Sequence, residues 1–80
     1  MDREAILEAI NSRVERYSID HNIKKECIAE RIGIGRTTFY MKLRGNSDFS
    51  LFEATALARL FGCTVDELIR PEEAADDREA

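Results

Sequence analysis

The connection between two short helical segments constrains the fold more than any other feature of the sequence. Apolar positions at helical spacing predict one helix over residues 24–32 and another over residues 36–43, so only three residues join them. Gly33 supplies the positive φ that a tight turn needs and that other residues adopt only at a cost. Ala29 is small enough to let the second helix approach the first, so the two must cross steeply. The apolar residues expected to fill the wedge between them are Ile28, Ile32, Ile34 and Phe39.

A third helix is predicted over residues 2–17, because apolar side chains recur there at helical spacing. These side chains are Ile6, Ile10, Val14 and Tyr17. Asp2 and Glu4 place negative charge in the first turn, where the helix dipole favours it. The turn-forming residues 18–22 are expected to form a loop, with His21 in solvent.

Two further helices are marked by capping boxes, in which a Ser or Thr side chain and a Glu three residues later satisfy the first backbone N–H groups. The box at Ser50–Glu53 starts a helix that ends at Gly62, and the box at Thr64–Glu67 starts a shorter helix over about residues 65–70. The residues expected to face inward from the first of these helices are Leu51, Ala54, Leu57, Ala58 and Phe61. With no convincing strand, the sequence predicts an all-α domain of five helices.

The formal charge of −4 is unevenly distributed along the chain. Residues 71–80 hold five acidic side chains and one basic one, and we expect them to form an acidic flexible tail after a domain at 1–70. Residues 24–45 instead hold six basic and two acidic side chains, a local net charge of +4. A local basic excess of this kind favours a negatively charged partner.

Several classes of protein are disfavoured by what the sequence lacks. No apolar run approaches the roughly 18 residues of a membrane span, and no apolar stretch follows a basic N-terminus, so we expect a cytoplasmic protein. Cys27 and Cys63 form no zinc spacing with the single His21, and both are expected to be buried as small hydrophobes. No paired acid and base, nucleophile or phosphate-binding loop is visible. We therefore expect neither an enzyme nor a cofactor.

The stretch IAERIGIGRTTFYMKLRG, residues 28–45, resembles the helix-turn-helix of phage repressor and Cro-like (XRE-type) DNA-binding proteins. Ala29, Gly33 and Phe39 stand where that motif has its small residue, its turn glycine and an apolar residue of the second helix. The stretch LARLFGCTVDEL is similar to the fourth and fifth helices of the same family. The resemblance covers about residues 24–69 and implies a compact, five-helix lambda-repressor-like domain.

One position departs from the family pattern, which usually has an apolar residue where this chain has Lys42. Leu43 is expected to take the core role one position later, on the same side of the helix as Phe39. The opposite side then carries Thr37, Tyr40, Met41 and Arg44.

The resemblance implies that the helix at 36–43 enters the major groove of double-stranded DNA. The residues carried over as base readers are Arg36, Thr37, Tyr40 and Met41. Those carried over as phosphate contacts are Lys24, Lys25, Thr38, Lys42, Arg44 and Asn46. Family members usually bind operators as two-fold dimers. Three apolar residues lie off the predicted core, namely Phe52, Leu60 and Ile69. They could form the dimer surface, or they could be ordinary partly exposed residues.

Other interpretations remain open at this stage. The lysines could form an ordinary solvated face, Tyr40 could pack on the first helix, and Arg36 could pair with Glu30. The TFY triplet also resembles TetR-type repressors, but their large ligand domain has no counterpart in 80 residues, so no small-molecule effector is expected. The acidic tail motivates a rival function, a protein-interaction module such as an antitoxin or anti-repressor. The function we favour is a sequence-specific DNA-binding regulator, most simply a repressor.

Overall fold

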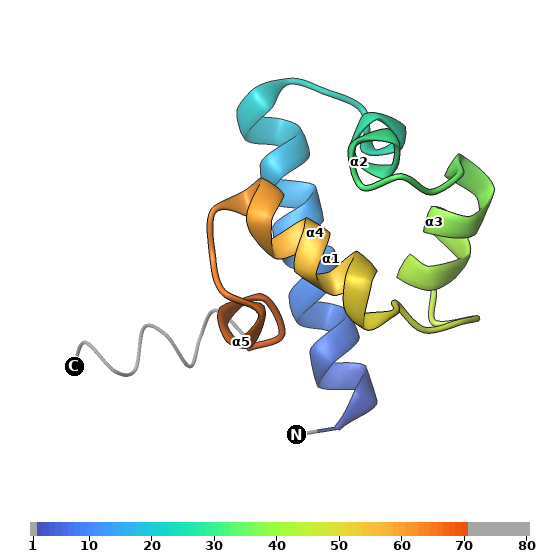
Figure 1. Cartoon of the computed structure of the whole chain (residues 1–80), viewed down its shortest axis with the longest axis vertical. Coiled ribbons are helices and arrows are strands. Elements are labelled where there is room, and N and C mark those ends of the chain that lie inside the picture. Colours follow the sequence, from blue (N-terminus) through green and yellow to red (C-terminus); the bar gives the residue numbers. More distant parts are fainter. Residues whose placement is uncertain (1, 71–80) are drawn as a thin grey trace.

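The computed structural model describes residues 2–70, which contain five helices and no strand. The helices are α1 (Arg3–His21), α2 (Lys25–Arg31), α3 (Arg36–Leu43), α4 (Leu51–Phe61) and α5 (Val65–Leu68). In Figure 1, α2 and α3 lie on one side of the view and α5 on the other, with α1 and α4 between them. The prediction of an all-α, five-helix domain is therefore confirmed. The predicted acidic tail, 71–80, lies outside the described residues.

Every helix contributes a fully buried side chain to one core. These side chains are Val14, Ile28, Phe39, Leu57 and Leu68. The predicted wedge between α2 and α3 is present, because Ile28 and Phe39 are fully buried and Ile32 and Ile34 pack against them half-buried. Burial of large apolar side chains is the main stabilising contribution in so small a domain. The orientation of α3 is therefore set by the core.

The first helix extends beyond its predicted end, and the prediction of a loop over residues 18–22 is wrong for all but its last residue. Asn22 ends α1 in the left-handed region, at φ 54°, where its backbone N–H bonds back to the carbonyls of Ser18 and Ile19. The His21 ring stacks on Tyr17 one turn earlier, with the ring centroids 4.0 Å apart. Contacts between residues four apart thus carry the helix through residues with weak helix propensity.

Both predicted capping boxes are present, at Ser50–Glu53 and Thr64–Glu67, and Gly62 ends α4 with a φ of +75°. Two details differ from the prediction. The last helix, α5, ends at Leu68. Leu51 is 74% exposed instead of buried, whereas Ala54, one turn later, packs against the core.

Candidate nucleic-acid interface

The turn between α2 and α3 is built on Gly33, which has a φ of +83°. A Cβ added at this position would meet nothing within 4 Å, so the backbone conformation, and not a lack of space, favours glycine here. The carbonyl of Ala29 accepts a hydrogen bond from the Ile34 N–H at 3.1 Å, which folds the chain back on α2. Ala29 is fully buried and α2 contacts α3 directly, as the sequence predicts.

One side of α3 is buried and the other faces solvent. Phe39 and Leu43 are buried, so the shift of the core position to Leu43 is confirmed. Residues on the solvent side are Arg36, Thr37, Thr38, Met41 and, just beyond the helix, Arg44 and Asn46. The Met41 side chain is among the more exposed apolar ones, at 40%.

Tyr40 lies at the border between these two sides. It is half-buried, packs against the core, and has its ring centroid 6.2 Å from that of Phe39. Partial burial of this kind agrees with the alternative interpretation of Tyr40 as a packing residue. A tyrosine commonly keeps its polar end in water while its ring is packed. Tyr40 therefore helps to anchor α3 and keeps part of its surface in solvent.

Two of the predicted DNA contacts are paired with carboxylates in the free protein. Arg36 Nη1 lies 3.4 Å from Glu26 Oε1, so its partner is Glu26 and not Glu30. Lys25 Nζ lies 3.0 Å from Glu15 Oε1. Exposed or partly exposed pairs of this type contribute only about 0–1 kcal/mol, so they do not prevent Arg36 or Lys25 from taking other partners. Sequence reasoning missed both carboxylates, because each pair joins two helices. Glu15 reaches Lys25 only when α1 and α2 pack together, and Glu26 reaches Arg36 only when α2 and α3 do.

Lys42, predicted to contact phosphate, lies instead between α3 and α4. Its side chain is only 12% exposed, and Nζ lies 2.5 Å from Glu53 Oε1 and 6.0 Å from the centre of the Phe49 ring. The position is semi-buried, as the family pattern of an apolar residue requires, and the ammonium is neutralised by Glu53. This pairing draws the Lys42 charge away from the solvent side of α3.

Glu53 links α3 to the start of α4 through one carboxylate. It accepts the Ser50 backbone N–H at 2.8 Å as part of the capping box and also holds Lys42. Burial of the carboxyl acts to raise its pKa, but the hydrogen bonds from Lys42 and Ser50, with the Lys42 charge, bring the pKa below the ordinary 4.5. The carboxylate is thus stabilised in its charged form.

This network predicts an acid-sensitive contribution to stability. A carboxyl whose pKa is lower in the folded state stabilises the fold above its unfolded pKa of about 4.5, and that stabilisation is lost as the pH falls through the lowered value. We expect Glu53→Gln to be less stable than the parent at pH 7 and to lose less stability between pH 6 and pH 3. Urea midpoints measured across that range check this. Glu8→Gln, which removes an exposed charge from α1, is the control. If the parent and Glu53→Gln lost equal stability as the pH fell from 6 to 3, the expectation would be contradicted.

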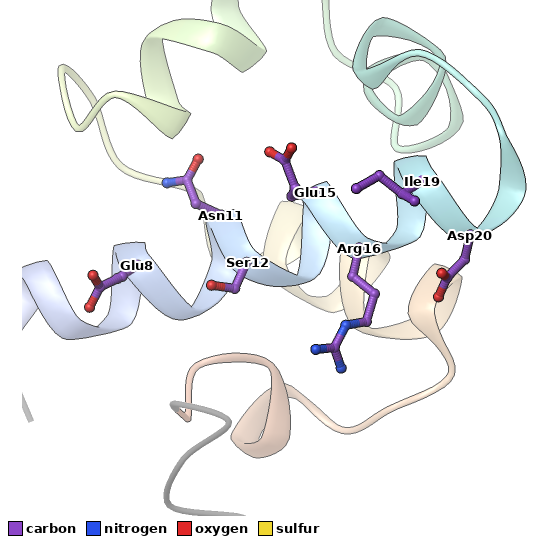
Figure 2. Close-up of a pocket in the computed structure, with 7 residues that line it drawn as sticks. All are labelled: Glu8, Asn11, Ser12, Glu15, Arg16, Ile19 and Asp20. Carbon is purple, nitrogen blue, oxygen red and sulfur yellow. The ribbon is translucent and has the colours of Figure 1, made fainter.

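Other features of the described residues offer no competing site. The surface depression drawn in Figure 2 is lined by seven residues that all belong to α1, and it does not reach the solvent side of α3. Cys27 and Cys63 are free and half-buried, and burial raises the pKa of the Cys63 thiol, which Arg13 lowers only in part. Within residues 2–70, no cluster of potential metal ligands occurs. None of the helices described there is long and apolar enough to cross a membrane.

Residues 13–74 match the family model of the Cro/C1-type HTH DNA-binding domain. The matched residues include all of α2, α3, α4 and α5 and the second half of α1. No curated protein and no solved structure matches the chain. The family match covers most of the 80 residues, and it agrees with the helix-turn-helix geometry of α2 and α3.

Proposed function

The chain belongs to the Cro/C1-type HTH DNA-binding domain family, and from this premise we propose that it is a transcriptional regulator that recognises a specific operator. Family membership implies binding to DNA. The observation that supports sequence recognition is the arrangement of α3, whose buried Phe39 and Leu43 turn a row of polar and apolar side chains toward solvent. An α-helix of this width fits the major groove, where each base pair presents a distinct pattern of hydrogen-bonding groups.

The proposed base contacts lie on α3. Arg36 at its first turn can donate two hydrogen bonds to guanine, and Thr37 and Met41 can contact a thymine methyl group. Tyr40, half-buried at the rim, can offer its hydroxyl to a base edge or to the sugar-phosphate backbone beside it. Placing base readers in the first turns of the recognition helix agrees with the way such helices enter the groove.

The proposed phosphate contacts lie at both ends of the helix-turn-helix. They are Lys24 and Lys25 at the start of α2, and Thr38, Arg44 and Asn46 on or after α3, all exposed apart from the half-buried Lys25. Lys42 is left out because Glu53 already neutralises its ammonium. Phosphate contacts position a protein on the duplex, whereas base contacts carry the sequence information.

We further propose that the protein acts as a repressor in the cytoplasm of a bacterial cell, or of a bacterium infected by a phage. An operator-bound domain of this size would block access of RNA polymerase to an overlapping promoter. Repression of this kind requires only occupancy of the DNA.

A second copy of the chain is the proposed partner, because one recognition helix reads too few base pairs for selective binding. Leu51 and Phe52, at the start of α4, are 74% and 86% exposed, and with Leu60 they line one shallow surface groove. Clustered exposed apolar side chains commonly mark an interface. Ile69 lies in a different groove, beside Ile6 and Ile10, so we do not include it in this surface.

The Phe52→Ser variant is expected to be monomeric and to bind operator more weakly than the parent, which should sediment as a dimer. Sedimentation velocity with and without DNA measures both effects. Ile19→Ser is the matched control, because Ile19 is 69% exposed on α1 and lies outside the groove. A parent that stays monomeric even on DNA, or equal effects of the two substitutions, would contradict the proposed surface.

Selection from a library of randomised duplexes tests the proposed function as a whole. We expect one motif to be enriched, and its two-fold symmetry would report the dimer. Binding should weaken as salt is raised, because phosphate contacts release condensed cations. Absence of binding at low salt, or binding with no enriched motif, would overturn the proposed regulator.

A further inference from the structure

The C-terminal end of α3 rests on three residues of α1 that are spaced four apart, namely Arg3, Leu7 and Asn11. The Asn11 amide nitrogen donates to the carbonyl of Leu43, the last residue of α3, at 2.9 Å. The same nitrogen donates to the Leu7 carbonyl at 3.0 Å, which anchors the amide on its own helix. Figure 2 shows the Asn11 side chain projecting from α1 toward the end of α3.

Arg3 holds the turn that follows α3. Its Nη2 donates to the Gly45 carbonyl at 2.7 Å, and its Nε donates to Asp48 at 2.9 Å. Gly45 has a φ of +89°, and a Cβ added to it would lie 3.0 Å from Leu7 Cδ2, so the turn lies directly against α1. Residues four apart share one face of a helix. This face of α1 therefore supports the end of α3 and the turn that follows it.

These contacts supply what α3 lacks by itself. The last carbonyls of any helix have no partner within the helix, and α3 has only eight residues. Asn11 provides the donor for one of these carbonyls, while Arg3 brings a positive charge to the negative end of the helix dipole. The start of α3 has no side-chain cap and is linked to α2 by the exposed Arg36–Glu26 ion pair, whereas hydrogen bonds from α1 hold the end of α3 and the turn after it.

We propose that Asn11, assisted by Arg3, is a positioning residue for DNA recognition that fixes the end of α3 and thereby the placement of Met41 and Arg44 on the duplex. The inference rests on the proposed function. Both residues precede residue 13, where the match to the family begins. Recognition residues must be held to within about half an ångström, so loosening one end of α3 should reduce discrimination between sequences.

The test compares Asn11→Ala with Ser18→Ala, using the full chain. Ser18 is a matched control, because its hydroxyl donates to the Ile23 carbonyl at the other end of α1. Dissociation constants are measured for the selected operator and for a scrambled duplex, well below the melting temperature of either variant. We expect Asn11→Ala to lower the ratio of specific to non-specific affinity roughly 2–30-fold, the range typical of substitutions that touch neither ligand. Ser18→Ala should leave the ratio unchanged.

A second measurement needs no DNA. The Asn46 N–H, which bonds to the Met41 carbonyl at 2.9 Å, should exchange with solvent faster in Asn11→Ala than in Ser18→Ala. Arg3→Met should show the same two effects and is expected to fold, because the Arg3 side chain is 58% exposed. If Asn11→Ala does not fold, the Arg3→Met variant tests the positioning role in its place.

The outcomes separate the two proposals. If the parent binds no duplex selectively, the proposed function fails and the positioning role fails with it. If the parent binds selectively but Asn11→Ala and Arg3→Met keep the parent ratio, the positioning role alone is overturned. An equal fall in the ratio of specific to non-specific affinity in Ser18→Ala would also overturn it. The fall would then reflect a general loss of stability and not the loss of the contacts between α1 and the end of α3.

Discussion

Replacing Phe39 with alanine is expected to lower the free energy of unfolding by about 3–5 kcal/mol, enough to leave much of the protein unfolded at physiological temperature. Phe39 is fully buried, and its ring meets that of Phe49 edge-on with the centroids 6.1 Å apart. The substitution would leave a cavity where α3 meets the core, and so small a domain has little stability in reserve. Urea unfolding followed by far-ultraviolet circular dichroism measures the loss.

Two neighbouring substitutions serve as controls for this expectation. Phe39→Leu keeps most of the buried volume and should cost clearly less than Phe39→Ala. Thr37→Ala changes an exposed position on the other side of the same helix and should change stability by no more than about 0.5 kcal/mol. A loss from Phe39→Ala no greater than that from Thr37→Ala would show that α3 is not anchored by its aromatic residue.

Arg36→Ala is expected to cost about 1–3 kcal/mol of affinity for the selected operator, or roughly 5–150-fold, and to relax the preference at one base pair. The physical reason is the loss of a bidentate donor to guanine from a helix that is otherwise unchanged. Fluorescence anisotropy with operators substituted one base pair at a time measures both quantities. The affinity for scrambled duplexes should change much less than the affinity for the operator.

Lys25→Ala provides the contrasting result in the same assay. A lysine that contacts only phosphate should weaken binding to all duplexes alike and reduce the slope of affinity against salt by about 1. Uniform losses from both substitutions would contradict the assignment of base contacts to α3. Arg70→Ala, which removes the same charge just after α5, should have little effect on either quantity, because α5 lies on the opposite side of the domain from α2 and α3 (Figure 1).

Local signals in the sequence predicted much of the fold. The bounds of α3, the two capping boxes and the turn at Gly33 follow from residues that interact within a few positions of one another. Two predictions failed. The predicted end of α1 was too early, because the turn-forming composition of residues 18–22 hid the local contacts, such as the Tyr17–His21 stack, that continue the helix. Leu51 has the right spacing for the inner side of α4, but it is exposed in the structure.

The candidate site was predictable as a surface but not as a set of contacts. The exposure of Arg36 and Thr37 follows from the burial of Phe39, which periodicity identifies. The ion pair of Lys42 with Glu53 could not be found, because it depends on how closely α3 approaches α4. The same reason hid the contact of Asn11 with the end of α3, which joins residues 32 positions apart.

The pairing of Arg36 with Glu26 has a consequence for how long the proposed operator complex would last. If Arg36 reads guanine as proposed, the base must replace the Glu26 carboxylate, so the free energy of the ion pair, about 0–1 kcal/mol for an exposed pair, is subtracted from the gain at the operator. At a site without that guanine the guanidinium can keep its carboxylate. The internal partner would therefore make the operator complex slightly weaker and shorter-lived than Arg36 alone would make it.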